Sequence, residues 1–352
     1  MMAPSGKPRY RWALAVTFVV GVAMAVGSLT MQLPSKAQGV DNLTNSFRPA
    51  FKADALAQTK TDMATVQAMS DELRGKAMPA IAGALKMTPA QLQTFIGQNF
   101  PAVAKGVSQL DTVLPYFSNL VNGLDAQAAN FHKADAIPTK NLPATTVPYI
   151  FLLPGLLLAA LSVIGWVLSS AAARRAVWGC TAVGLVLIVA PLILSVPAKA
   201  QAVDNLTNAF RPVFTDQGAA TTRANMDTVQ NMSDELQAKM LPALAGALQM
   251  TPAQLQGFIG QNFPAVAKGV SQLNVILPRF QGLVKGIEAN VGNFKKADAI
   301  PTKGTPTTLL HWLFVIPGIV LLLTGAVALF VPWWSGARAP TPRWAPAGGA
   351  SA

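Results

Sequence analysis

The chain has 352 residues, of which 51% are apolar and only 12% are charged, and this composition excludes an ordinary soluble protein. A single cysteine, Cys180, excludes an internal disulfide framework and a zinc site built from cysteines. Two histidines, His132 and His311, leave little material for a histidine-rich metal site or a catalytic triad. The net charge of +12 would suit a nucleic-acid-binding protein, so its distribution along the chain has to be considered.

Four stretches of about 20 residues or more contain no Asp, Glu, Lys or Arg: 12–33, 148–169, 176–196 and 309–334. Each is long enough to cross a hydrocarbon core of about 30 Å as a helix. The first stretch follows a basic N-terminus, as in a secretory signal peptide, but its apolar run is longer than signal peptides have. We therefore predict four transmembrane helices, the first of them a retained anchor.

Basic residues distinguish the two sides of the membrane. The short segments before the first span, between the second and third, and after the fourth contain no acidic residue but seven basic ones: Lys7, Arg9, Arg11, Arg174, Arg175, Arg338 and Arg343. The two long inter-span segments together hold 20 basic and 15 acidic residues and no basic run. By the positive-inside rule, both termini are cytoplasmic and the long segments are extracytoplasmic. Most of the net charge is therefore a topology signal, and we expect no nucleic-acid partner.

These assignments predict nine segments in chain order. They are a cytoplasmic N-terminus (1–11), the first span (12–33), a first extracytoplasmic domain (34–147), the second span (148–169), a cytoplasmic loop (170–175), the third span (176–196), a second extracytoplasmic domain (197–308), the fourth span (309–334) and a disordered, Pro- and Gly-rich cytoplasmic tail (335–352).

The sequence contains an internal repeat. Positions 34–140 (repeat 1) align without a gap with positions 197–303 (repeat 2), and 72 of the 107 paired positions are identical. The shared motifs are Asp-Asn-Leu-Thr-Asn at Asp41 and Asp204, Met-Ser-Asp-Glu-Leu at Met69 and Met232, and Ala-Asp-Ala-Ile-Pro-Thr-Lys at Ala134 and Ala297. The pattern predicts a tandem duplication of one unit of span, ectodomain and span. Any pseudo-two-fold axis should then run along the membrane normal.

The spans are less alike than the repeats, with about 10 identities in 45 positions compared at the same spacing along the chain. Free interchange of lipid-facing apolar residues would explain this difference, and so would recent exchange of sequence between the two ectodomains. We favour a functional interpretation, in which the spans anchor the chain and the ectodomains perform its specific function.

Apolar residues recur at alternating steps of four and three near the end of each repeat, which is typical of a heptad seam on a helix. The seam residues are Val103, Val107, Leu110, Leu114, Phe117, Val121, Leu124 and Phe131 in repeat 1, and Val266, Val270, Leu273, Leu277, Phe280, Val284, Ile287 and Phe294 in repeat 2. Pro115 and Pro278 interrupt the seams and are expected to kink or split each helix. A helix that continued past the proline would measure about 45 Å over about 30 residues.

Other helices are expected upstream of the seam. Thr88-Pro89-Ala90-Gln91 predicts a helix start with a capping box, and Thr251 begins the same tetrapeptide in repeat 2. A further helix is expected over 63–73, and an amphipathic segment over 40–51 follows the first span. Each ectodomain is therefore predicted to be a bundle of four or five helices, and the fold class all-α.

The block 87–110 is identical in repeat 2 except at Thr94, where repeat 2 has Gly257, and the identity includes polar residues away from the seam. These residues form a candidate interaction face: Gln98, Lys105, Ser108 and Gln109, with Gln261, Lys268, Ser271 and Gln272 in repeat 2. The face is expected to contact the sister repeat, another protomer or a partner protein, although a solvated helix surface would show the same retention.

No catalytic, cofactor or metal site is predicted. The two histidines have no histidine counterpart in the other repeat unit, and phosphate-binding and hydrolase motifs are missing from the sequence. The pairs Asp71-Glu72 and Asp234-Glu235 follow a serine and are interpreted as first-turn acids of a helix, favourable to its dipole.

The predicted spans contain no ionisable residue of the kind that proton-coupled and ion-coupled transporters use. Pro154-Gly155 and Pro317-Gly318 are expected to kink their helices rather than break them. Cys180 is expected to be a small buried apolar residue of the third span.

These observations favour a non-enzymatic membrane protein of a bacterial cytoplasmic membrane, whose duplicated ectodomains act as a scaffold for an envelope assembly. The expected partners are membrane lipids and either a second copy of the chain or another envelope protein. Two alternatives stay open: a component of lipid or hydrophobic-molecule transport, and an oligomeric pore. A continuous apolar cavity lined by the heptad residues would favour lipid handling, whereas tightly packed seams with an apolar outer stripe would favour assembly. An axial opening through a ring of protomers would favour the pore.

Overall fold

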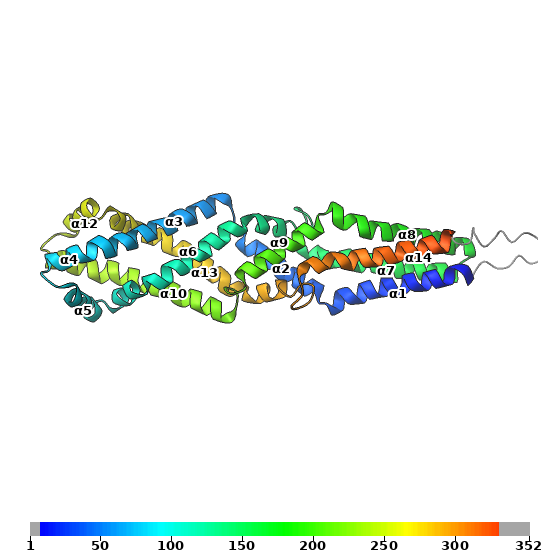
Figure 1. Ribbon diagram of the computed structural model, residues 1–352, viewed down its shortest axis with the longest axis horizontal. Coiled ribbons are helices and arrows are strands. Elements are labelled where there is room, and N and C mark those ends of the chain that lie inside the picture. The colour runs from blue at the N-terminus through cyan, green and yellow to red at the C-terminus, as the bar shows by residue number, and fades with distance from the viewer. Residues whose placement is uncertain (1–7, 331–352) are drawn as a thin grey trace, which may run out of the picture. The chain divides into compact units, whose positions relative to one another are not determined.

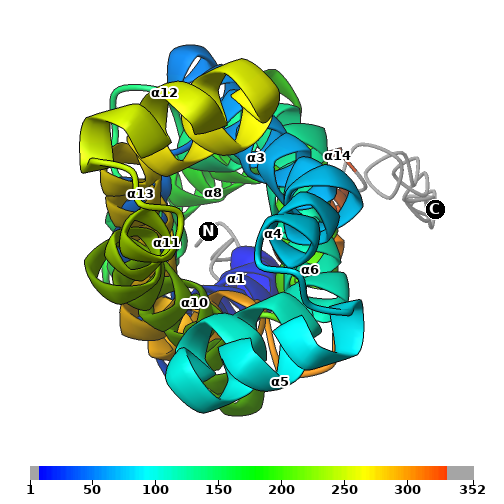
Figure 2. The same ribbon diagram turned by 90° about the vertical axis from the view of Figure 1, so that its left-hand side faces the viewer.

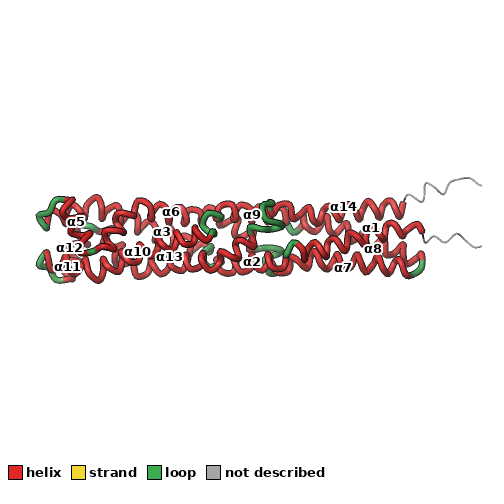
Figure 3. The backbone as a smooth tube through the Cα atoms, turned by 90° about the horizontal axis from the view of Figure 1, so that it is seen from below, coloured by secondary structure: helices red, strands yellow, loops and turns green. Residues whose placement is uncertain are grey.

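The computed structural model describes residues 8–330, which form helices joined by turns (Figure 1; Figure 3). Within this range no extended strand is present, and one isolated β-bridge joins Thr139 to Leu142. Lys7, Arg338, Arg343, the end of the fourth predicted span and the predicted tail lie outside the described residues. The described chain divides into two compact units, one made of the apolar helices and one made of the two repeats.

The first unit contains four helices that are long and apolar enough to cross a membrane, as the sequence predicts. They are α1 (Pro8–Thr30), α7 (Val147–Val167), α8 (Ser170–Ile193) and α14 (Trp312–Phe330). The chain is therefore a multi-pass membrane protein. One boundary differs from the prediction, because α8 begins at Ser170 and carries Arg174 and Arg175 in its first turns rather than in a loop.

Paired glycines bring these helices close together. A Cβ atom added to Gly21 of α1 would lie 2.6 Å from the carbonyl oxygen of Gly155 in α7, and one added to Gly318 of α14 would lie 2.8 Å from that of Gly184 in α8. Small residues of this kind allow backbones to approach inside a membrane, where packing rather than the hydrophobic effect holds helices together. Both α7 and α14 continue through their internal prolines, so neither helix is broken there.

The second unit contains two sets of elements that occur in the same order in the two repeats. The first set is α2 (Leu33–Phe47), α3 (Ala53–Glu72), a π-helical turn (Leu73–Ala77), α4 (Met78–Ala84), α5 (Pro89–Asn99), α6 (Pro101–Asp135) and a 3₁₀ turn (Ala144–Thr146). The second set is α9 (Val196–Phe210), α10 (Asp216–Glu235), a π-helical turn (Leu236–Met240), α11 (Leu241–Ala247), α12 (Pro252–Asn262), α13 (Pro264–Ala297) and a 3₁₀ turn (Thr307–His311).

Local sequence signals explain several of these elements. The predicted capping box is present at the start of α5, where Thr88 Oγ1 accepts from the backbone N–H of Gln91, and the same box opens α12 at Thr251. The seam helix α6 continues through Pro115 for 35 residues, about 53 Å. Of the two outcomes expected at this proline, a kink or a split, the split does not occur, and α13 likewise continues through Pro278.

The two repeats fold together rather than as the two separate bundles that the sequence suggested. Helix α3 of repeat 1 packs against α13 of repeat 2, and α10 of repeat 2 packs against α6 of repeat 1. Seen end-on, α5 and α12 lie on opposite sides of this unit (Figure 2). The seam side chains Phe117 and Phe280 meet edge to face with their ring centres 5.8 Å apart. One apolar core therefore joins both repeats.

Candidate functional site

Two glutamates, one from each repeat, hold the repeats together, because each caps the seam helix of the opposite repeat. Glu72, in the last turn of α3, accepts hydrogen bonds at Oε2 from the backbone N–H groups of Ala265 (2.6 Å) and Val266 (2.9 Å) in the first turn of α13. Glu235 of α10 does the same for α6, at 2.6 and 3.1 Å. The interpretation of these acids as first-turn residues of their own helix was therefore wrong. They stabilise a helix N-terminus, but that of the other repeat.

The electrostatics of these caps follow from their surroundings. Both carboxylates are shielded, with side chains 8% and 7% exposed for Glu72 and Glu235. Burial acts to raise the pKa of Glu72, but the two backbone donors of α13 and the ammonium of Lys76 outweigh it and hold the pKa below its ordinary value. The pKa of Glu235 is lowered in the same way by the N–H groups of α6 and by Lys239. Both caps are therefore charged near neutral pH.

Methionine side chains occupy glycine positions across the same interface. Met232 of α10 covers Gly106 of α6, where an added Cβ would lie 2.6 Å from the methionine Cγ. Met69 of α3 covers Gly269 of α13, where an added Cβ would lie 2.7 Å from the methionine Cβ. The shared Met-Ser-Asp-Glu-Leu motif thus supplies both a cap and a packing contact to the opposite repeat.

The other two shared motifs fix the turns that lead into α7 and α14. The Asp41 carboxylate accepts from the backbone N–H groups of Ala144 (2.7 Å) and Thr145 (3.1 Å), and Asp204 caps the equivalent turn before α14. Asp135 forms a two-point ion pair with Arg48, at 2.7 and 2.9 Å. This hydrogen-bonded pairing raises the pKa of Arg48.

Two lysines link these turns across the repeats. Lys36 Nζ donates to the carbonyl oxygen of Pro301 in repeat 2 at 2.7 Å, and Lys199 Nζ donates to that of Pro138 in repeat 1 at 2.7 Å. Partial burial lowers the pKa of both lysines. Each repeat therefore binds the segment that follows the seam helix of the other repeat, as well as the start of that helix.

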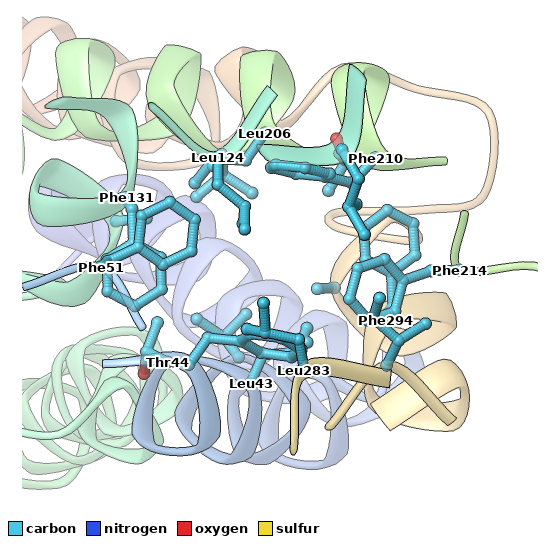
Figure 4. Close-up of a pocket in the computed structure, with 18 residues that line it drawn as sticks. Leu43, Thr44, Phe51, Leu124, Phe131, Leu206, Phe210, Phe214, Leu283 and Phe294 are labelled. Carbon is cyan, nitrogen blue, oxygen red and sulfur yellow. The ribbon is translucent and has the colours of Figure 1, made fainter. Parts of the chain in front are cut away.

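An apolar cavity of about 90 Å³ lies between the repeats, among α2, α6, α9 and α13 (Figure 4). Its lining consists of nine pairs of equivalent positions, eight of them identical in the two repeats: Val40 and Val203, Leu43 and Leu206, Thr44 and Thr207, Phe47 and Phe210, Phe51 and Phe214, Leu120 and Leu283, Leu124 and Ile287, Phe131 and Phe294, and Ala134 and Ala297. We call this space the inter-repeat cavity.

Aromatic stacks form two sides of the inter-repeat cavity. Phe51 stacks on Phe131 with ring centres 4.0 Å apart, and Phe214 stacks on Phe294 at 4.6 Å, on the opposite side in Figure 4. The threonines contribute methyl groups, because the hydroxyl of Thr44 donates to a backbone oxygen within its own helix and that of Thr207 does likewise. The lining therefore offers packing surface and no free polar group.

Glycines on the seam helices make room for rings from the opposite repeat. Phe47 lies over Gly286 of α13, where an added Cβ would be 3.4 Å from the ring, and Phe210 lies over Gly123 of α6 at 3.6 Å. A second apolar cavity, of about 70 Å³, lies farther along the seam and is bordered by Met69, Met232 and other apolar side chains. Along the seam, the contact between Phe117 and Phe280 lies between the residues that line the first cavity and those that line the second.

The predicted site residues fall into two groups in the structure. Fourteen seam residues are buried, and Val107 and Val270 are half-buried. All eight residues of the candidate interaction face are exposed, and Ser108 and Ser271 donate to carbonyl groups of their own helices. The contacts between the repeats described above involve other residues, and the role of this face stays a prediction.

Sequence reasoning did not identify the inter-repeat cavity as a site. The sequence predicts an amphipathic segment over 40–51 but does not show that its apolar face borders a cavity together with the seam. Within residues 8–330 no group of three or more His, Cys, Asp or Glu side chains is placed to hold a metal ion. Cys180 is buried in the apolar helix unit, as expected.

Comparison with protein-family models gives no match for this chain, and no curated protein matches it.

Proposed function

We propose that this protein binds a hydrophobic molecule of the lipid class in the inter-repeat cavity and takes part, without catalysis, in lipid handling in a bacterial envelope. The observation that carries the proposal is the lining of the cavity, which consists of sixteen apolar residues and two threonines with bonded hydroxyl groups and comes equally from both repeats. Pockets for small ligands are generally concave and mostly apolar, and they lie between packed elements.

The size of the inter-repeat cavity limits what it can hold. A cavity of about 150 Å³ lined by Leu, Ile and Phe accommodates benzene, so about 90 Å³ fits only a few carbon atoms. The proposed occupant is therefore the end of an acyl chain or a comparably narrow apolar group. A charged headgroup would stay outside, because burying it without partners would be costly.

The scaffold function predicted from the sequence has less support from the geometry. An assembly surface would be expected to present a continuous apolar stripe. Among the described residues of the repeat unit, the exposed large apolar side chains are Leu142, Phe258 and Val275, which do not belong to one shared element. Assembly through the polar face at Lys105 and Lys268 is the remaining form of the scaffold hypothesis, and charge reversal at both positions would test it by native mass spectrometry.

The proposed location and topology of the protein rest on the distribution of basic residues and on the internal sequence repeat. We propose a tandem duplication in a bacterial cytoplasmic membrane, with both termini cytoplasmic, both repeats extracytoplasmic and the pseudo-two-fold axis along the membrane normal. Homo-oligomers, partner proteins of the envelope and a pore built from several copies remain alternatives that native mass spectrometry of the detergent-extracted protein would separate.

A photoreactive long-chain fatty acid with a diazirine at its tail would test the function. On the full-length protein we expect saturable labelling of peptides from α2 and α9. Replacing Leu43 and Leu206 together with tryptophan would fill the cavity from both repeats and reduce this labelling several-fold. Leu142→Trp is the matched control, because Leu142 is 50% exposed in the same unit. Non-saturable labelling, or equal labelling of the filled and control variants, would contradict the proposal.

A further inference from the structure

A larger crevice lies within the apolar helix unit, between α1 and α14, with α7 contributing to its wall. Its volume is about 300 Å³, more than either cavity of the repeat unit. Met24, Gly27 and Ser28 of α1, Phe151 of α7 and Ile316 of α14 are among the residues that line it. We call this space the intramembrane crevice.

Small residues on α1 leave the intramembrane crevice open. A Cβ atom added to Gly27 would meet nothing within 4 Å, so empty space lies directly beside this glycine. Gly21, nearly two turns earlier, differs, because an added Cβ there would lie 2.6 Å from the carbonyl oxygen of Gly155. The glycine at position 27 is therefore not explained by close approach of a neighbouring helix.

The equivalent positions of the other repeat unit carry larger side chains. At the spacing that relates the two repeats, Ala23, Gly27 and Ser28 of α1 correspond to Val186, Ala190 and Pro191 of α8. In each of these three pairs the residue of α8 is the bulkier one. The small residues are thus a property of α1 rather than of the repeated pattern.

The lining of the intramembrane crevice accepts only an apolar occupant. The one polar side chain named above, Ser28, is 3% exposed and donates through its hydroxyl to the carbonyl oxygen of Pro148 at 3.5 Å. The crevice is continuous with the outer surface of the helix unit, because its lining residues Ile316 and Trp312 are 56% and 47% exposed. For helices that cross a membrane, the medium at that surface is lipid acyl chains.

The volume selects among apolar occupants. At about twice the ~150 Å³ cavity that accommodates benzene, the crevice has room for about a dozen carbon atoms, which is a long stretch of one acyl chain. A helix from a second copy is about 10 Å across and would need far more space than this. We propose that the intramembrane crevice binds one acyl chain of a membrane phospholipid, at a site independent of the inter-repeat cavity.

The basis of binding is shape. Lipid tails are as apolar as the lining, so no hydrophobic driving force favours the crevice over bulk lipid. Preference for the crevice comes from van der Waals packing around the chain and from filling a space that the helices leave empty. Removing that space, rather than changing its polarity, is therefore the perturbation that should abolish binding.

Photolabelling of the full-length protein in phospholipid vesicles tests this proposal. The probe is phosphatidylglycerol with a diazirine in one acyl chain, and adducts are mapped by peptide mass spectrometry. We expect adducts concentrated on residues 20–31 and 312–320, and at least a several-fold loss of them in Gly27→Leu, whose side chain enters open space. Ala190→Leu, at the equivalent position of α8, is the matched control and should leave them unchanged.

Three outcomes would overturn the proposal: adducts spread evenly over all four apolar helices, unchanged labelling in Gly27→Leu, or crosslinks from this region to a second copy. If Gly27→Leu does not fold, Ala23→Leu fills the crevice from a neighbouring position and decides the question. Fatty-acid labelling of α2 and α9 in the same samples distinguishes the two sites. It should be unaffected by Gly27→Leu, and its absence in the wild type would contradict the proposed function while leaving the crevice result standing.

Discussion

Replacing Gly106 with leucine should separate the two repeats at one of their two methionine contacts. The Gly106 backbone lies beneath Met232, and even a methyl group added there would be 2.6 Å from the methionine Cγ. A leucine has no room unless the methionine side chain leaves its site, which is 6% exposed. The substitution therefore acts on repeat 2 through a residue of repeat 1.

The expected loss of folding free energy follows from the displacement of the Met232 side chain. Truncating a buried methionine costs about 2–5 kcal/mol, and forcing extra methylene groups into a packed core adds about 1–3 kcal/mol. Leucine recovers about 1 kcal/mol over glycine through helix propensity, and part of its own side chain is buried. These terms together give a net loss of folding free energy of about 2–7 kcal/mol. For a unit of this size it corresponds to a fall in Tm of about 4–28 °C.

The control is Gly97→Leu on α5, where an added Cβ would meet nothing within 4 Å and the same propensity gain applies. Met232→Ala combined with Gly106→Leu should recover much of the loss, because the leucine can then occupy the vacated space. If Gly106→Leu and Gly97→Leu unfold at the same temperature, the cross-repeat packing described above is incorrect.

The assay has to follow the repeat unit rather than the whole chain. All seven tryptophans lie outside the repeats, at positions 12, 166, 178, 312, 333, 334 and 344. Tryptophan fluorescence therefore reports on the apolar helices or the tail, and it is expected to change little in Gly106→Leu. Thermal melting by far-ultraviolet circular dichroism, with hydrogen exchange of repeat peptides to localise the effect, measures the loss directly.

Further predictions concern the charges at the repeat interface. Glu72→Ala should lower the melting temperature of the repeat unit by several degrees more than Asp71→Ala, because only Glu72 accepts from N–H groups of α13. The pKa values of Glu72 and Glu235 are lowered in the folded protein. The stability that these two charged groups add to the fold is therefore complete above about pH 4.5 and is lost as the pH falls through the lowered pKa values. A variant with glutamine at both positions should lack this acid-dependent change in melting temperature. Arg279→Tyr should lower the free energy of unfolding by about 1–3 kcal/mol, because it leaves the buried Asp62 without its ion pair. Adding Asp62→Asn should recover most of that loss. An equal loss in the single and double variants would contradict the pairing.

The features that could be predicted from sequence are those that depend on neighbours along the chain. The apolar runs, the capping box at Thr88 and the heptad spacing each involve residues within about one or two helical turns, and each has its expected outcome in the structure. For Pro115 the same local rules predict a kink or a split, and they do not decide between the two. The helix continues past it, with the neighbouring Leu114 and Phe117 both buried in the common core.

The pairing of the repeats could not be predicted, and the reason is the repetition itself. Glu72 would find the same N–H donors at the start of the seam helix of its own repeat, at Ala102 and Val103, as it finds at Ala265 and Val266. Because the two copies share these residues, contacts within a copy and contacts between copies leave identical patterns in the sequence. The inter-repeat cavity was missed for the same reason, since it exists only when segments of both copies are brought together.

Positions where the copies differ give independent support for an interlocked arrangement. Position 116 is tyrosine in repeat 1, and its hydroxyl hydrogen-bonds to Thr222 of repeat 2, whereas the equivalent Arg279 pairs with the buried Asp62 of repeat 1 at 2.8 Å. The counterpart of Asp62 in repeat 2 is the neutral Asn225, so the copy that faces the uncharged tyrosine lacks the acid. A buried carboxylate opposite Tyr116 would be an uncompensated charge, which is costly in a packed interface. Charge has therefore changed on both sides of the contact together, as expected if these residues of the two repeats pack against each other.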